Sequence, residues 1–560
     1  METKSLEHDP LKRLSRLRWR SFALVLVGLV LYWLALPPVG AWPLGWLVAV
    51  PWVVAICGTE ESQPGWRRVW LAGWIFWLAT MHFIPYPHSA LWVAWPLLAA
   101  YLAFYPVAIY SISRRLVSRL RLPAVVALPL VWATLEWVRR WMFTGLGMAS
   151  LAHSQYRQTP IIQIASFGGE GLLSLCMMFV GATIGLVLVR GSRKELRLAI
   201  PVLILAVAAV YWCGATRLNS IPIPAETVKL NSIPVVLVQG SIDTVFFGSG
   251  EAEHQQEWQR GQRDQYRKLS LEARQRWPEA ELLIWPEGIF GEWLVLDNLP
   301  DEFANQRLAT AIEQSQLLLQ KEWGRVTGYY PEEFDDAAPQ KTPIALLTGV
   351  PGIRLLEEEQ FNSAMLVVES GTVSQSYNKN HRVLFGEYVP LAKEIPWIGR
   401  MSPIGPGIGR GLHGEAFQFK NVVLMPEICF ETTVPHHVRR HWCELDAVGT
   451  PPDCLLCLTN DGWFYGTSCL DFHLACNVFR AVETGTPMLV AANTGFSADI
   501  DAAGRILQQG PRRSTGLILA RLASRAPGRT GYIVVGDWPW RILSLLILTG
   551  LLLSCRTARN

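Results

Sequence analysis

The fold of the C-terminal half is decided by the stretch Met425-Pro426-Glu427-Ile428-Cys429-Phe430-Glu431, which continues the apolar run 422–424. A short apolar run of this kind predicts a buried β-strand, and Cys429 follows its end. In layered α/β sheets, reactive side chains gather beyond strand ends. An isolated cysteine near a strand is, however, more often a small core residue. The rest of the chain therefore decides whether Cys429 is a reactive thiol.

Further apolar runs surround this stretch and predict strands at 233–240, 281–287, 342–350, 364–369, 372–377, 455–459 and 487–492. Polar or amphipathic segments at 251–276 and 472–483 predict helices. Strands that alternate with helical connections are typical of an α/β fold. Two more candidate residues lie at strand ends: Glu287 closes the run 281–287, and Lys379 follows 372–377.

Glu287, Lys379 and Cys429 together form a chemically complete set. A thiolate is a nucleophile, a carboxylate can take its proton and return it to a leaving group, and an ammonium can stabilise an oxyanion. Helix-like residues after Cys429 would favour the thiolate form. Glu427, by contrast, is predicted to face solvent.

Bulk composition and other motifs give no support to several alternative classes. The net charge is only +4, so nucleic-acid binding is not expected. Cys454 and Cys457 form a lone CxxC inside an apolar run, which favours a buried strand over a metal site. The chain has no P-loop or dinucleotide fingerprint, and we expect neither a metal nor another cofactor.

The N-terminal half is apolar and predicts a membrane domain. Stretches near the roughly 20 residues that span hydrocarbon lie at 21–37, 40–57, 69–86, 91–112, 123–138, 170–189 and 197–214, and an eighth lies at 542–555. The first is expected to be an anchor and not a cleaved signal peptide. We therefore predict a membrane domain at 1–214, an extracytoplasmic catalytic domain at 215–540, and a last span with a cytoplasmic tail at 541–560.

Basic residues predict the orientation of these spans. Lys and Arg gather in the N-terminus, in alternate loops and in the tail, whereas the loop 85–90 has none. The positive-inside rule then places both termini in the cytoplasm and the large domain outside. Glu136 stands out within the fifth stretch, where a carboxylate is costly. It is expected either to pair with Arg139 or Arg140 or to serve a substrate, and 139–168 is expected to include an interfacial or re-entrant segment.

Three motifs carry a family resemblance: Trp285-Pro286-Glu287, Tyr377-Asn378-Lys379 with Phe385-Gly386-Glu387-Tyr388-Val389-Pro390, and Ile428-Cys429-Phe430-Glu431. They resemble the signatures of the nitrilase superfamily. Together with the membrane half, the chain looks more closely like the apolipoprotein N-acyltransferases, a membrane-embedded branch. The resemblance implies a multi-span helical bundle joined to an αββα sandwich.

The resemblance also implies roles. Cys429 would carry an acyl chain from a phospholipid as a thioester and pass it to the amine of a diacylated apolipoprotein. Glu287 would act as the base and acid, and Lys379 would support the oxyanion with the backbone N–H of Phe430. Glu387 would orient Lys379, and Glu431 would position Cys429 or a lid. A monomer in the bacterial inner membrane is expected, with its catalytic domain on the periplasmic side.

Two rival hypotheses remain open at the level of sequence. A membrane-tethered amidase would use the same triad with water as the acceptor. A transporter or receptor with an inactive nitrilase-like domain would predict a damaged triad or several charged residues within the spans. Extra loop length is expected at 331–341 and 434–453.

Overall fold

The computed structural model describes residues 10–190, 193–221, 232–245, 252–297, 306–328, 343–390, 407–412, 414–524 and 528–556. It divides into two compact units, the first made of Met1–Met142, Gly147–Ser220 and Thr530–Asn560, and the second of Phe143–Leu146 and Ile221–Arg529. These boundaries differ from the predicted limits at 214 and 540. Helix α10 (Arg193–Ser220) continues past 214, and the short helix α16 (Gly531–Val535) packs against α8 (Ala165–Gly168) of the first unit.

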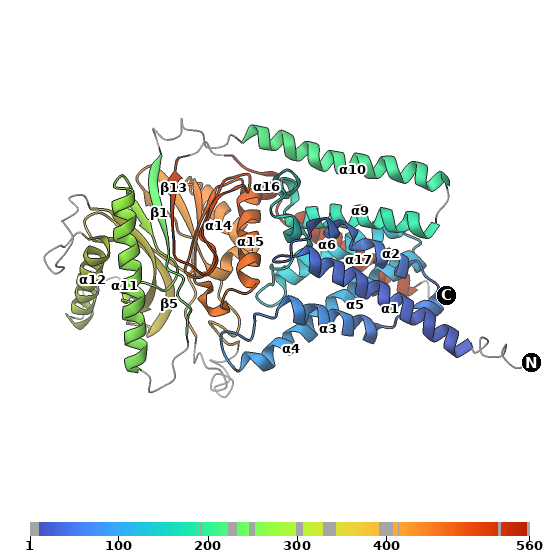
Figure 1. Cartoon of the computed structure of the whole chain (residues 1–560), viewed down its shortest axis with the longest axis horizontal. Coiled ribbons are helices and arrows are strands. Elements are labelled where there is room, and N and C mark those ends of the chain that lie inside the picture. Colours follow the sequence, from blue (N-terminus) through green and yellow to red (C-terminus); the bar gives the residue numbers. More distant parts are fainter. Residues whose placement is uncertain are drawn as a thin grey trace, which may run out of the picture. The chain divides into compact units, whose positions relative to one another are not determined.

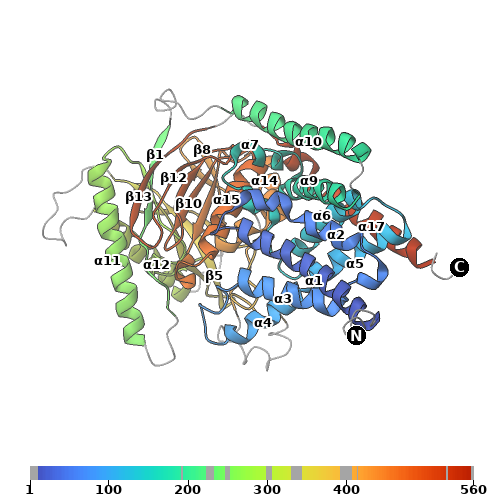
Figure 2. The same ribbon diagram turned by 45° about the vertical axis from the view of Figure 1, so that its right-hand side comes forward.

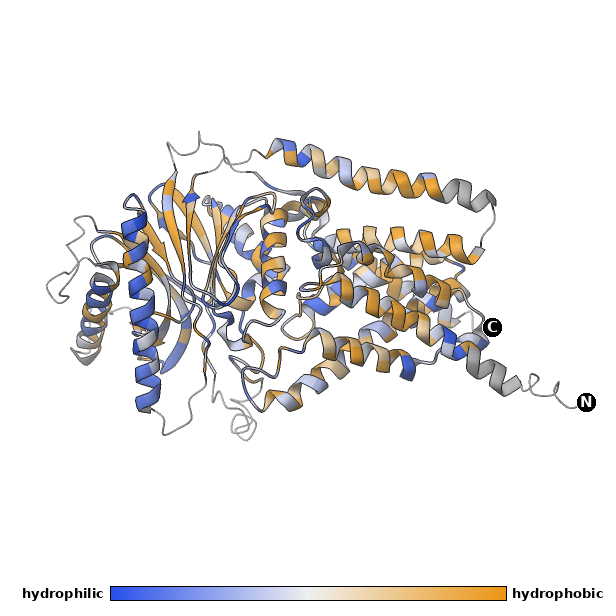
Figure 3. Cartoon of the chain, viewed as in Figure 1, coloured by the Kyte–Doolittle hydropathy of each residue, from blue (hydrophilic) through white to orange (hydrophobic). Residues whose placement is uncertain are grey.

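The first unit is helical. Its longer helices are α1 (Pro10–Ala35), α2 (Ala49–Ile56), α3 (Trp66–Thr80), α4 (Leu91–Leu102), α5 (Phe104–Arg119), α6 (Ala124–Trp141), α9 (Glu170–Arg190), α10 and α17 (Trp538–Arg556). Figure 3 shows these helices largely as orange ribbon, the colour of hydrophobic residues, whereas helix α11 (Ala252–Arg276) of the second unit is mainly blue. Apolar side chains on exposed helix faces are typical of lipid contact.

Five described helical segments are long and apolar enough to cross a membrane: Leu17–Ala35, Leu91–Arg119, Glu170–Val189, Ile200–Ser220 and Trp538–Cys555. The expectation of eight spans therefore exceeds what length and composition support among the described helices. The stretch 40–57 divides into the 3-10 helix η1 (Trp42–Leu47) and α2, and α3 has only 15 residues. Helix α6 carries three charged residues near its end, Glu136, Arg139 and Arg140.

Glu136 belongs to a buried network, which agrees with the pairing reading of its role. Its carboxylate lies 3.9 Å from Arg140 and accepts hydrogen bonds from the Leu151 backbone N–H at 2.9 Å and from Trp132 Nε1 at 3.1 Å. Arg139 donates instead to the Met148 carbonyl at 2.8 Å. The segment after α6 then forms the short helices η3 (Leu151–Gln155), α7 (Thr159–Ile162) and α8. Glu136 thus holds this segment against α6.

The second unit contains two β-sheets. The seven-stranded sheet has the order β13-β1-β2-β4-β5-β6, with β3 paired to β4, and the six-stranded sheet has the order β12-β11-β10-β9-β8-β7. The strands of the first sheet are β1 (Ile233–Gln239), β2 (Leu282–Ile284), β3 (Leu294–Val295), β4 (Ala345–Arg354), β5 (Glu359–Val367), β6 (Val373–Asn378) and β13 (Gly516–Leu522). Those of the second are β7 (Phe417–Phe419), β8 (Val422–Ile428), β9 (Cys454–Thr459), β10 (Met488–Ala492), β11 (Ala498–Ile500) and β12 (Ile506–Gln509).

Helices cover both outer faces of this pair of sheets (Figure 1; Figure 2). Helices α11 (Ala252–Arg276) and α12 (Gln306–Thr327) pack on the first sheet, and α14 (Pro435–Ala447) and α15 (Cys469–Thr484) on the second. Strand β1 shows why its sequence lacks alternation: Val235 and Leu237 face the other sheet, while Val236 and Val238 pack beside Tyr266 of α11. A strand covered on both faces is apolar throughout. The predicted αββα sandwich is confirmed.

The structure also corrects one expectation about the second unit. Residues 434–453 were expected to be extra loop, but most of them form α14. The other predicted loop, 331–341, lies outside the described residues. Strand β9 is completely buried, as predicted for the CxxC run.

Candidate active site

Cys429 lies where β8 ends and the 3-10 helix η6 (Cys429–Thr433) begins. Its backbone has φ of 54°, in the left-handed region that a residue other than glycine adopts at a cost. Such strain at a sharp strand-to-helix turn is a frequent feature of functional sites. The side chain is half-buried and packs against the core between the sheets.

Glu287 follows β2, on the other sheet. Its carboxylate accepts a hydrogen bond from Asn362 Nδ2 at 2.7 Å and another from the Asn460 backbone N–H at 2.9 Å. Burial raises the pKa of Glu287 above its ordinary value, although Lys379 and these donors oppose that effect. A carboxylate with a raised pKa is better matched to exchanging a proton near neutral pH.

Lys379 is the first residue after β6 and is only 1% exposed. Its Nζ donates to Glu387 Oε1 at 2.7 Å and lies 3.7 Å from Glu287 Oε1. Burial alone would lower the pKa of Lys379, but Glu387, Glu287 and Cys429 outweigh it and raise the pKa above its ordinary value. Lys379 is therefore a permanent cation between two carboxylates.

The electrostatics of this site favour the neutral thiol. Burial and, after it, the charge of Glu287 raise the pKa of Cys429 well above its usual range, and Lys379 only partly offsets them. The expectation that a helix end favours the thiolate is therefore wrong. A neutral thiol needs a base before it can react as a nucleophile, and the Glu287 carboxylate lies beside the same lysine.

Glu431 is fully buried and connects the segments that carry Cys429 and Lys379. One oxygen accepts from the backbone N–H groups of Asn380 (2.6 Å) and His381 (2.7 Å), both just after Lys379. The other accepts from the Ile428 N–H (2.7 Å), just before Cys429, and from the Tyr377 hydroxyl (2.9 Å). Glu431 thus sets the position of Cys429 relative to Lys379.

Glu427 does not face solvent, contrary to the prediction. It is 0% exposed, and its carboxylate lies 2.9 Å from His441 Nδ1 and 3.1 Å from His437 Nε2, both on α14. Because α14 was predicted to be loop, His437 and His441 were not recognised as partners of Glu427.

His473 is another residue that the sequence did not assign to the site. It lies on α15, with Nε2 3.1 Å from the Cys429 carbonyl and Nδ1 3.1 Å from Asp461 Oδ1. Burial would lower the pKa of His473, but Asp461 outweighs this and raises it. A ring protonated on both nitrogens donates to the Cys429 carbonyl and supports the strained turn.

Phe430 and Asn362 complete the surroundings. The ring of Phe430 stacks on His381, with centroids 5.9 Å apart. His381 Nε2 donates in turn to the carbonyl of Thr144, at 2.7 Å. Asn362 also contacts Glu387, at 3.3 Å, so one amide bridges both carboxylates beside Lys379. Asn362 lies within β5, where no local pattern distinguishes it from an ordinary strand residue.

A cavity of about 1110 Å³ leads to these groups. Its lining includes the polar residues Glu287, Glu387 and Asn460 and the aromatic residues Trp258, Trp293 and Trp463. This volume slightly exceeds the usual range for small-molecule sites, about 300–1,000 Å³, so the cavity can hold a substrate with a long apolar part.

Two family models match the chain: the apolipoprotein N-acyltransferase N-terminal domain over residues 28–183, and carbon-nitrogen hydrolase over residues 252–529. The chain is similar to an apolipoprotein N-acyltransferase of Rhodopirellula baltica, with 28% identity, 96% of this chain and 97% of the relative covered. One from Geobacter metallireducens is 27% identical, with coverages of 87% and 86%. A solved nitrilase-superfamily structure from Saccharomyces cerevisiae matches with 14% identity and a TM-score of 0.35, covering 52% of this chain and 90% of that one.

Proposed function

We propose that this chain, which belongs to the apolipoprotein N-acyltransferase family, transfers an acyl chain from a membrane phospholipid to the N-terminal amine of a diacylglyceryl-cysteine lipoprotein. The observation that carries the mechanism is the convergence of Cys429 and Lys379 beside Glu287, which lines the cavity. Family membership supports the reaction class, and the geometry supports the roles proposed for the three residues.

In the first half-reaction, Glu287 takes the proton of Cys429 as the sulfur attacks the ester carbonyl of the phospholipid. The oxyanion of the tetrahedral intermediate is stabilised by Lys379 Nζ and by the Phe430 backbone N–H. The C–O bond then breaks, Glu287 gives its proton to the leaving alkoxide, and a lysophospholipid departs. Losing one such oxyanion donor typically slows a reaction by about 10²–10³-fold.

In the second half-reaction, the acceptor amine attacks the thioester carbonyl. Glu287 takes a proton from the nitrogen, the C–S bond breaks, and the proton returns to the sulfur of Cys429. The product is an amide, and the enzyme regains its resting thiol. A thioester suits this step because it retains acyl reactivity towards an amine.

The place of action is part of the same proposal. The distribution of Lys and Arg favours a multi-pass protein of the bacterial inner membrane whose catalytic domain faces the periplasm. Both reactants are lipids, so a membrane-anchored enzyme meets them in their own phase. A monomer suffices, because one chain supplies every side chain named in the mechanism.

Mass spectrometry of the purified enzyme after exposure to a labelled phospholipid tests the proposal. We expect one acyl mass on Cys429, which leaves on addition of a diacylated lipopeptide and reappears on the peptide amine. A label that never reaches the amine contradicts acyl transfer. Label recovered only as free fatty acid instead supports the membrane-tethered amidase or hydrolase reading.

A further inference from the structure

Two carboxylates flank the nucleophile in the sequence, Glu427 two residues before Cys429 and Glu431 two residues after it. Both are 0% exposed. Two buried like charges at close range cannot both remain ionised unless a cation lies between them. The structure must therefore contain a group that compensates them.

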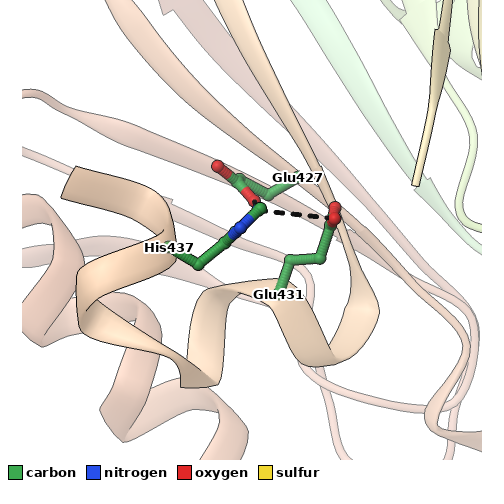
Figure 4. Close-up of side chains that lie close together, drawn as sticks. All are labelled: Glu427, Glu431 and His437. Atoms are coloured by element: carbon green, nitrogen blue, oxygen red, sulfur yellow. Dashed lines mark ion pairs between the residues drawn. The ribbon is translucent and has the colours of Figure 1, made fainter. Parts of the chain in front are cut away.

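That group is His437, in the first turn of α14. Its Nε2 lies 3.1 Å from Glu427 Oε2 and 3.4 Å from Glu431 Oε1, and Figure 4 shows the ring directed between the two carboxylates. Burial would lower the pKa of His437, but Glu427 and then Glu431 outweigh it and raise the pKa to about 10. Burial would raise the pKa of Glu427, but His437 and His441 outweigh it and lower the pKa to about 2.

Other titratable groups face the same cluster. Tyr377, on β6, donates its hydroxyl to Glu431, and its ring stacks on His441 at 5.7 Å. His381, after β6, has its ring centroid 5.5 Å from that of His437. Burial and then the His437 charge lower the pKa of His381, as does Arg410 to a smaller extent. His437 is therefore the imidazolium and His381 the neutral ring.

The charge of Glu431 matters because both of its carboxylate oxygens accept hydrogen bonds from the segments around Cys429 and Lys379. It accepts four hydrogen bonds, from Asn380, His381, Ile428 and Tyr377. Only an ionised carboxylate has the lone pairs for four donors, since a protonated one becomes a donor itself. If Glu431 took up a proton, at least one of the segments carrying Lys379 and Cys429 would lose its anchor.

The same three side chains could also be considered for a metal site, because their ligand atoms lie within 4.8 Å of one another. The contacts of Glu431 argue against it. Each of its oxygens already accepts two hydrogen bonds, three of the four from backbone N–H groups that cannot turn away. A cation at this position would need a lone pair that Glu431 does not have. The imidazolium needs none, since its attraction is largely ionic.

We propose that His437 and Glu427 are positioning residues for acyl transfer: the His437 cation, paired with Glu427, compensates the buried charge of Glu431, and Glu431 then holds the nucleophile turn and the lysine segment in register. This inference rests on the proposed function where acyl transfer is measured, but not where alkylation of Cys429 is measured. Neither residue touches the cavity or the reacting atoms, so both act through Glu431.

The test compares four proteins: wild type, His437→Gln, the double variant His437→Gln/Glu427→Gln, and the control His254→Gln, which changes an exposed histidine on α11. Acyl-enzyme formation is measured from about pH 5 to 9, the range in which histidines usually titrate. With the cation lost, the buried charges of Glu427 and Glu431 repel one another, and this repulsion disturbs the contacts by which Glu431 holds both segments. His437→Gln should therefore acylate about 10–100-fold more slowly, as for a misplacement near 1 Å.

The double variant separates charge from packing. Removing the Glu427 charge as well removes the repulsion, so acylation should recover at least tenfold relative to His437→Gln. If the double variant is as slow as the single one or slower, at equal thermal stability, the electrostatic role is refuted. Unchanged kinetics in His437→Gln would refute it equally, and the control should match wild type.

A second readout does not depend on the acyl donor. The rate at which iodoacetamide alkylates Cys429, followed by mass spectrometry of its peptide, should fall in His437→Gln and recover in the double variant. If wild type forms no acyl-enzyme but alkylation still follows this pattern, the proposed function fails while the positioning role stands. Stoichiometric zinc in purified wild type that is lost in His437→Gln would overturn the ion-pair assignment.

Discussion

Replacing Glu387 with glutamine tests whether Lys379 is held in place by its closest contact. Glu387 Oε1 accepts from Lys379 Nζ at 2.7 Å, and Oε2 accepts from the Val383 backbone N–H at 2.8 Å. Glutamine offers one oxygen and one NH₂ group, so it can satisfy only one of these donors and places its own donor against the other. The exchange removes the carboxylate charge with almost no change in volume.

The magnitude follows from the burial of the pair. The Lys379 and Glu387 side chains are 1% and 17% exposed, so solvent screens their interaction little. A hydrogen bond to a charged group contributes about 1.5–3 kcal/mol. At about 1.4 kcal/mol per factor of ten, acylation should slow by roughly 10–150-fold, provided the full contribution is lost in the transition state.

The assay is single-turnover formation of the acyl-enzyme with a labelled phospholipid, with thermal unfolding followed in parallel. Glu253→Gln, an exposed glutamate on α11, is the matched control and should behave as wild type. A Glu387→Gln enzyme that folds normally and acylates within about twofold of wild type would show that Glu387 does not position the lysine, since even the weakest expected loss is about tenfold.

Four further outcomes are expected. Cys429→Ala should never acquire an acyl group, and Cys429→Ser should fail to complete turnover because a hydroxyl is a poor match for a carboxylate base; acyl mass on the alanine variant would refute the nucleophile. The rate of wild-type acylation should fall as the pH drops through the raised pKa of Glu287, because the protonated carboxyl group cannot accept the thiol proton. Glu287→Gln should abolish acylation at every pH. Leu458→Ala, at a site with 0% exposure in the core between the sheets, should lower the free energy of unfolding by about 2–5 kcal/mol in denaturant titrations of detergent-solubilised protein; a smaller loss would mean the core relaxes into the space. A reporter fused at Leu218 should be found outside the cytoplasm, and a cytoplasmic signal would overturn the proposed orientation.

Much of the second unit was predictable because its central strands, such as β1, β2, β9 and β10, are buried on both faces. Continuous apolar runs such as Cys454–Thr459 then have no other stable place than a covered sheet. Strand ends also fixed where Glu287, Lys379 and Cys429 would lie. The sequence pattern alone did not predict that these three residues lie close together. They do so because the two sheets face one another, and the family resemblance was what indicated it.

The membrane half was less well predicted, because hydropathy counts apolar residues without regard to the backbone. The stretch 40–57 is apolar throughout, yet it divides between η1 and α2. The stretch 123–138 belongs to helix α6, which continues beyond it and also carries Arg139 and Arg140. Within this helix Glu136 and Arg140 form an ion pair. A partnered charge can remain within such a helix at much lower cost than an isolated one.

Two predictions, that Glu427 faces solvent and that 434–453 is loop, were wrong for the same physical reason. Along β8, Val422, Leu424 and Ile428 face the core between the sheets, so the period of two turns Glu427 to the opposite face. That face would be exposed if the following segment were loop, and a carboxylate there would be ordinary surface. Because α14 covers it instead, the carboxylate is buried and needs His437 and His441, which the same helix supplies. A helix with histidines four residues apart on one side was therefore the pattern to look for, and it predicts both the cover of the sheet and the partner of the charge.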